Sequence, residues 1–195
     1  MGRVVLALVA VLSGCNFFDL DPPERHDAAV TLEDPGAFGA AFLDSHNAVR
    51  AATGPGLPAM SWSPDVAAFA QAWADELERR TGNCDVRTLS TPHRPSSGEF
   101  AQRFGENITW NAGSIYEPPL VVDGWVSERA DYSYAANSCA PQKVCGHYTQ
   151  VVWATSVRLG CAVARCDGAG VPFGVSQIWV CNYDPPGNYQ GERPY

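Results

Sequence analysis

The sequence predicts an α+β fold, an α-β-α sandwich in which a small antiparallel sheet lies between helical layers and disulfides add stability. Three observations lead to this expectation. Apolar residues recur at helical spacing through the first two thirds of the chain, and after Ser133 the period changes to the alternation of strands. Six of the seven cysteines lie between Cys84 and Cys181, which is typical of a disulfide-held domain. Helices followed by a run of strands give the α+β class.

Three helices are expected. The first ends before Gly54, and the second has Ser63 as its N-cap, Pro64 at its first position and Gly82 at its end. The third is expected from Pro118 to Ala130. Their apolar faces are Phe38, Phe42, Leu43, His46 and Val49; Val66, Phe69, Ala70, Trp73 and Leu77; and Leu120, Val121, Val122, Trp125 and Val126.

Three strands are expected in the last third of the chain. Residues 147–153, 159–165 and 176–183 alternate between polar and apolar side chains. The glycine-rich segment 167–170 predicts a hairpin between the second and third of them. The first strand would begin with His147, while Glu106 falls in a short, turn-like segment.

The N-terminus has the pattern of an export signal. Arg3 precedes an apolar run over residues 4–12, which is too short to span a bilayer. The run ends Leu-Ser-Gly-Cys at Cys15, which resembles a bacterial lipobox. We therefore expect a signal peptide over 1–14, a lipidated tether over 15–36 that contains a solvated His26, and a folded domain over 37–195. The alternative is an ordinary export signal with an incidental Cys15.

Composition excludes several classes of protein. The 195 residues suffice for one well-buried domain, and 46 % hydrophobic content with 17 % charge excludes a disordered chain. The net charge of -8 and the absence of a Lys/Arg cluster in the sequence argue against nucleic-acid binding, and Lys143 is the only lysine. We expect a monomer with no nucleic-acid partner.

A series of motifs resembles the CAP superfamily, which comprises cysteine-rich secretory proteins, antigen-5 allergens and plant class-one pathogenesis-related proteins. The similarity covers roughly residues 40–195, and the ending GERPY is most similar to the plant class. The motifs are LDSHNAVR at 43–50, LPAMSW at 57–62, GENI at 105–108, WVSER at 125–129, CGHYTQVVW at 145–153 and CNYDPPG at 181–187.

The resemblance implies a cleft lined by two histidines and two acidic residues, which correspond here to His93, Glu106, Glu128 and His147. Taken singly, each of these residues has an ordinary structural explanation, and so does His46, which we interpret as structural. Imidazole nitrogens suit zinc, so His93 and His147 are the expected ligands of Zn²⁺ or another divalent cation. Were the protein an enzyme, Glu106 or Glu128 would be the general base.

Spacing and the resemblance together favour three disulfides, Cys145–Cys161, Cys166–Cys181 and Cys84–Cys139, out of the 15 connectivities that six cysteines allow. With Cys15 lipidated, the domain would contain no free thiol. No Cys-x-x-Cys pair supports the alternative of a zinc–cysteine site.

The functional expectation is a non-enzymatic, extracytoplasmic lipoprotein. What the resemblance implies most often is binding of a lipid or sterol-like ligand, held between helices and away from the His/Glu cleft, or binding of an extracellular protein surface. The alternatives are a zinc-dependent hydrolase or protease that uses the cleft, and a purely interactive module.

Overall fold

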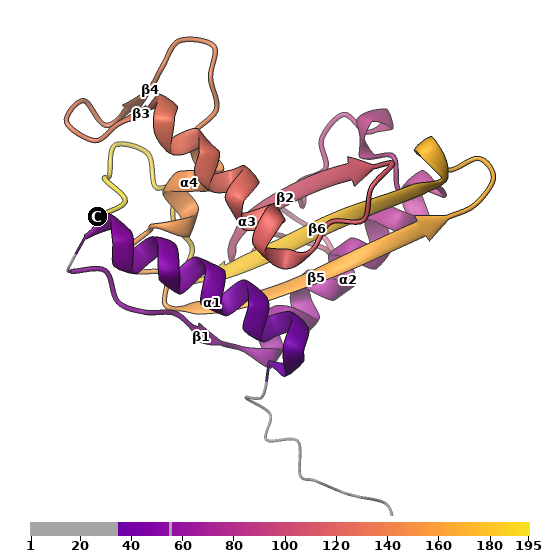
Figure 1. The fold of residues 1–195 in the computed structure, drawn as a ribbon, viewed down its shortest axis with the longest axis horizontal. Helices are drawn as coiled ribbons and strands as arrows, with labels where there is room; N and C mark the ends of the chain where they lie inside the picture. Colours follow the sequence, from indigo (N-terminus) through magenta and orange to yellow (C-terminus); the bar gives the residue numbers. More distant parts are fainter. Residues whose placement is uncertain (1–34, 55) are drawn as a thin grey trace, which may run out of the picture. The chain divides into compact units, whose positions relative to one another are not determined.

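The computed structural model describes residues 35–54 and 56–195 (Figure 1). The expected signal peptide, the lipidated Cys15 and the tether up to residue 34, with His26, lie outside the described residues. The last expected tether residue, Gly36, already begins the first helix. Among the described residues, no helix is both long and apolar enough to cross a membrane.

The described chain contains four α-helices, a four-stranded sheet and a separate two-stranded hairpin (Figure 1). The sheet order is β1-β5-β6-β2, in which β1 pairs parallel with β5 and the other pairs are antiparallel. The helices are α1 (Gly36–Thr53), α2 (Pro64–Thr81), α3 (Pro118–Val126) and α4 (Gly146–Val151). The strands are β1 (Ser61–Trp62), β2 (Gly105–Ala112), β3 (Tyr132–Ser133), β4 (Ser138–Cys139), β5 (Arg158–Asp167) and β6 (Val175–Asp184), with 3-10 turns at Val86–Thr88, Ser127–Asp131 and Pro172–Gly174.

The sheet separates two apolar cores, which confirms the predicted α+β sandwich (Figure 1). Successive side chains of a strand point to opposite faces, so Trp179 and Tyr183 of β6 pack toward α1, α3 and α4, while Ile178 and Val180 pack toward α2. The first core includes Phe42, Met60, Val122, Trp125, Tyr148 and Val151; the second includes Ala70, Trp73, Leu77, Ile108 and Ala162.

The first three helices follow their local sequence signals. Ser63 accepts a hydrogen bond from the Val66 amide at 3.4 Å, and Gly82 ends α2 with φ +68°. The helix α1 ends at Thr53, as predicted. The third helix is shorter than expected, because α3 ends at Val126 and the chain continues as a 3-10 turn that carries Glu128.

The predicted strand over 147–153 is wrong, because this segment forms the short helix α4. Tyr148, Val151 and Val152 lie three and four residues apart and pack into one apolar core, while the intervening polar Thr149 and Gln150 are also buried and are hydrogen-bonded. The buried guanidinium of Arg50 donates to the carbonyls of Val151 and Trp153 at 3.0 and 2.8 Å. This contact satisfies backbone groups that the end of a helix leaves without partners. Packing against α1 therefore decides the conformation of a segment whose β-branched residues favour a strand.

The turn-like interpretation of Glu106 is also wrong, because Glu106 lies on β2, an edge strand that pairs with β6 along its whole length. The inward positions of β2 include Asn107 and Asn111, which are buried and hydrogen-bonded. Polar residues at inward positions hide the apolar alternation that marks a strand.

All three expected disulfide pairings are wrong, although all six cysteines from Cys84 onward are paired. The bonds are Cys84–Cys166, Cys139–Cys145 and Cys161–Cys181. Cys161 and Cys181 stand directly opposite each other on β5 and β6, with 4.1 Å between their Cα atoms. At that distance the two side chains are neighbours on one face of the sheet, so the strand register dictates this pair.

Candidate functional site

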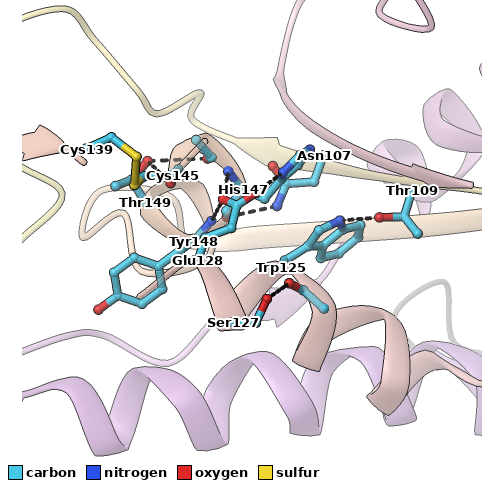
Figure 2. Close-up of polar contacts among 12 residues, drawn as sticks. Asn107, Thr109, Trp125, Ser127, Glu128, Cys139, Cys145, His147, Tyr148 and Thr149 are labelled. Atoms are coloured by element: carbon cyan, nitrogen blue, oxygen red, sulfur yellow. Dashed lines mark hydrogen bonds and ion pairs between the residues drawn. A yellow bond between two sulfur atoms is a disulfide. The ribbon is translucent and has the colours of Figure 1, made fainter. Parts of the chain in front are cut away.

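Glu128 accepts three hydrogen bonds from the start of α4, two of them from His147. The His147 Nδ1 donates to Glu128 Oε1 at 2.6 Å, and the backbone amides of His147 and Tyr148 donate to Glu128 Oε2 at 2.9 and 3.1 Å (Figure 2). The carboxylate thus receives two donors from the first turn of α4, in addition to the ring. This arrangement fixes the position of the ring as well as its tautomer.

Trp125 supports the same imidazole from one side. Its ring stacks on that of His147 at a centroid distance of 6.3 Å and an interplanar angle of 15°. The indole is itself fixed, because its Nε1 donates to Thr109 Oγ1 at 2.7 Å (Figure 2). Residues of α3, of β2 and of the 3-10 turn that carries Glu128 therefore orient one histidine of α4.

His93 forms the matching pair with Glu106. The His93 Nδ1 donates to Glu106 Oε1 at 3.0 Å, and the Arg94 amide donates to the same oxygen at 3.2 Å. The Arg94 Nε lies 3.4 Å from Glu106 Oε2, and both of these side chains are buried, at 1 % and 3 % exposure. Burial lowers the pKa of Arg94 to about 10, while the charge of Glu106 opposes the shift.

The structure brings both histidines to one hollow of about 220 Å³, whose lining also includes Glu106 and Asn188. A second hollow of about 370 Å³ shares His93, Glu106 and Asn188 with it and extends along Gln102 and Phe104. Glu128 does not line either hollow and stands behind His147. Of the four residues grouped from the sequence, three line the first hollow, while Glu128 acts through His147.

Two residues that sequence reasoning missed belong to the same site. Arg94 neutralises the buried Glu106, and Asn107 ties His147 to the core by donating to the His147 carbonyl at 3.1 Å. Each of them directly follows a residue that was singled out, and a buried carboxylate calls for a cation beside it. The need of a buried Glu106 for a nearby cation therefore pointed to Arg94.

A chain of buried hydrogen bonds continues from Asn107 into the core. The Asn107 Nδ2 donates to the Tyr183 hydroxyl at 3.0 Å, and that hydroxyl lies 2.9 Å from His46 Nε2. The His46 Nδ1 is 2.8 Å from the Phe42 carbonyl and must donate to it, so Nε2 accepts from Tyr183. His46 is fully buried, and desolvation is the main reason why its pKa falls to about 4. His46 is a structural residue of the core.

The donor set suits a divalent cation only in part. Because each Nδ1 is occupied by a glutamate, Nε2 is the nitrogen that remains for a ligand, and a carboxylate behind a metal-binding histidine is the usual arrangement. However, nowhere in residues 35–54 and 56–195 do three or more His, Cys, Asp or Glu side chains cluster in a way that could hold a metal. Protein ligands would therefore fill two positions of a tetrahedral zinc ion, and water or a bound molecule would fill the others.

The family is decided by comparison with known proteins. The profile of the "Cysteine-rich secretory protein family" matches residues 43–183, which include Glu106, Glu128 and His147 as well as His93. The chain belongs to the cysteine-rich secretory protein (CAP) family. It is 43 % identical to "Pathogenesis-related protein PR-1 type" of Sambucus nigra over 154 residues, 79 % of this chain and 80 % of that protein. It is 44 % identical to "Pathogenesis-related protein 1" of Arabidopsis thaliana over the same shares of the two chains.

A solved structure supports the fold. The structure titled "Crystal Structure of Na-ASP-1" superposes with a TM-score of 0.56 at 24 % identity, over 80 % of this chain and 40 % of that longer chain. This similarity concerns the fold alone. Membership in the family and three disulfides, which persist in oxidising compartments, make this an extracellular domain.

Proposed function

We propose that the chain is a non-enzymatic, extracellular binding protein in which His93 and His147 together hold a divalent cation, zinc in the first place, through their Nε2 atoms. The observation that carries this proposal is the pairing of each Nδ1 with a glutamate, together with the lining of one hollow by both rings. A carboxylate behind the ring fixes the tautomer that a metal needs and raises the basicity of the ligating nitrogen. A bound zinc would supply a positive centre for an anionic group of a ligand.

Binding is better supported than hydrolysis because both carboxylates are occupied. Glu128 accepts from one imidazole and two backbone amides. Glu106 accepts from His93 and from the Arg94 amide, and its second oxygen faces the Arg94 guanidinium and the Asn182 amide at 3.4 and 3.5 Å. A general base must be able to accept a proton from water. A zinc-dependent hydrolase that uses Glu106 or Glu128 remains the second candidate.

An apolar ligand, a lipid or sterol-like molecule, is proposed to bind away from the two His–Glu pairs. The support is a hollow of about 650 Å³ beside α2, in which Phe69, Phe100 and Phe104 offer an apolar surface among the charged side chains of Asp65, Arg94, Glu99 and Arg103. Arg103 lies over the Phe69 ring at 4.8 Å and offers a cation at the edge of this hollow. A protein surface that presents an apolar side chain would suit the same place. Anchoring to a bacterial membrane through Cys15 is a separate proposal, which rests on the lipobox pattern.

Zinc binding is tested by calorimetry at neutral pH on the whole mature protein. Wild type is expected to take up one zinc ion, and His147→Ala and His93→Ala are each expected to abolish the uptake. Glu128→Gln keeps the shape of the side chain and removes its charge, so we expect a 10- to 100-fold loss of affinity. His26→Ala is the matched control and should bind as wild type does. Absence of uptake by wild type, or uptake that survives His147→Ala, would reduce the two His–Glu pairs to structural hydrogen bonds.

A further inference from the structure

The disulfide between Cys139 and Cys145 differs from the other two in what it joins. Its two cysteines are only 6 positions apart in the sequence, compared with 20 for Cys161–Cys181 and 82 for Cys84–Cys166. Its position also matters, because Cys145 directly precedes α4 and so stands two residues before His147. Figure 2 shows this bond beside the first turn of α4.

The same disulfide is open to an attacking molecule. Both half-cystines line a surface hollow of about 320 Å³, and Cys139, the half that a reductant would attack, is only half-buried, while Cys145 is buried at 6 % exposure. Residues 141–144 of the loop are all exposed. Cys161 and Cys181 are buried within the sheet at 3 % and 0 % exposure. In the remaining bond Cys166 is half-buried, but its partner Cys84 is fully buried in the core against α2.

Position separates the two partly accessible bonds. Both Cys139 and Cys145 line a surface hollow, whereas Cys84 packs in the core against α2, so a reductant reaches the Cys139–Cys145 bond first. In the chain-entropy model the short Cys139–Cys145 loop also contributes least to stability, so the domain stays folded when this bond opens. The hairpin that carries Cys139 also has other attachments. Arg193 donates to the carbonyls of Tyr134 and Ala135 at 3.2 and 3.1 Å, so the hairpin stays in place when the disulfide opens.

We propose that Cys139–Cys145 is a redox switch for the metal-binding histidine. A thiolate of a dithiol reductant attacks the sulfur of Cys139, the electron pair of the S–S bond leaves with Cys145, and Cys145 takes up a proton. The second thiol of the reductant then displaces Cys139 from the mixed disulfide. The products are two cysteine thiols in the protein and one disulfide in the reductant, a two-electron exchange.

Reduction removes the covalent link that holds the start of α4. The Cys145 carbonyl accepts from the Thr149 amide and hydroxyl at 3.0 and 3.1 Å, so a displaced Cys145 disturbs the first turn directly. That turn presents the His147 amide to Glu128, which fixes the ring. Asn188 still donates to the Gly146 carbonyl at 2.8 Å, so the helix is loosened and not lost. We therefore expect zinc affinity to fall about tenfold, an effect that rests on the zinc site proposed above.

The test is stepwise reduction of the folded mature protein by dithiothreitol, followed by alkylation and peptide mass mapping. Cys139 and Cys145 should be labelled first, while the other four cysteines remain oxidised. Labelling of Cys84 and Cys166 first, or of all six together, would overturn the proposal. This readout is independent of zinc, so it separates failure of the switch from failure of the zinc site.

The effect of the Cys139–Cys145 disulfide on the zinc site is measured on the partly reduced wild type and on the double variant Cys139→Ser/Cys145→Ser. The His147 ring resonances should broaden or shift in both samples, and zinc affinity should fall about tenfold in both. Unchanged His147 resonances in the partly reduced protein would overturn the switch, even where the double variant fails to fold. If wild type binds no zinc, the zinc proposal fails, and the ring resonances still decide the effect of reduction on α4.

Discussion

Acid should destabilise this domain through His46, a buried histidine that folding keeps neutral. Desolvation and the nearby Arg50 lower the pKa of His46 from 6.5 to about 4, although its bond to the Phe42 carbonyl opposes the shift. Between these two pH values the unfolded chain binds a proton that the folded chain does not. The free energy of unfolding should therefore be unaffected by His46 above pH 6.5 and fall as pH drops from 6.5 to 4. The total loss corresponds to roughly 3 kcal/mol, with a slope of at most about 1.4 kcal/mol per pH unit.

Urea denaturation at pH 7, 6, 5 and 4 measures the loss of unfolding free energy in acid. A variant that lacks the imidazole shows how much of that loss is due to His46. Carboxylates also titrate near the lower limit, so the informative quantity is the difference between wild type and His46→Gln at each pH. The variant is less stable at pH 7, because glutamine does not reproduce the two bonds of His46 to Phe42 and Tyr183. Its deficit should shrink by roughly 3 kcal/mol between pH 7 and pH 4. Parallel pH curves for the two proteins would refute the buried, neutral imidazole.

The remaining predictions concern the ends of α4 and the N-terminus. Arg50→Lys should lower the free energy of unfolding by about 2–4 kcal/mol, because an ammonium cannot satisfy the carbonyls that the buried guanidinium binds; a loss below 0.5 kcal/mol in denaturant titration would contradict this. Cys145→Ala should lower the free energy of unfolding by about 2 kcal/mol and leave the Cys139 thiol open to alkylation. Cys84→Ala should lower it by about 4 kcal/mol, because the disulfide that it removes closes a longer loop. Equal losses for the two variants would contradict the dependence on loop length. Cys15→Ser should move the bacterially expressed protein from the detergent phase to the soluble fraction, and a wild type that is already soluble would remove the lipid anchor.

Local signals predicted those elements whose ends depend on their own residues. The start of α2 needs only Ser63 and Pro64, and its end needs only Gly82, so it could be located from the sequence. The β5–β6 hairpin also follows from alternation and its glycine-rich turn. In α4 and β2, by contrast, tertiary partners decide the structure. Arg50 lies about a hundred residues before the carbonyls that it binds in and just after α4, and no pattern within 145–153 reports it.

The candidate site also depends on tertiary contacts more than on local sequence signals. His93, Glu106, Glu128 and His147 were grouped by resemblance, because their spacing along the chain does not indicate that they meet. The disulfide pairings do not follow from the sequence for a related reason, since six cysteines allow 15 connectivities. In the observed register Cys161 and Cys181 are equally far from position 171 and stand opposite each other. The expected turn over 167–170 would place Ser176 opposite Cys161 instead, so the register that decides this pair depends on the longer connection between the strands.

The central claim is that one cation binds to Nε2 of both His93 and His147. Long-range ¹H–¹⁵N spectra of the imidazole rings, recorded while zinc is added at neutral pH, test it most directly. Before zinc, both rings should carry their proton on Nδ1, since each Nδ1 donates to a glutamate. On titration the Nε2 resonances of His93 and His147 should shift together, and those of the buried His46 should not move. Shifts at different zinc concentrations, or at only one of the two rings, would contradict a shared site.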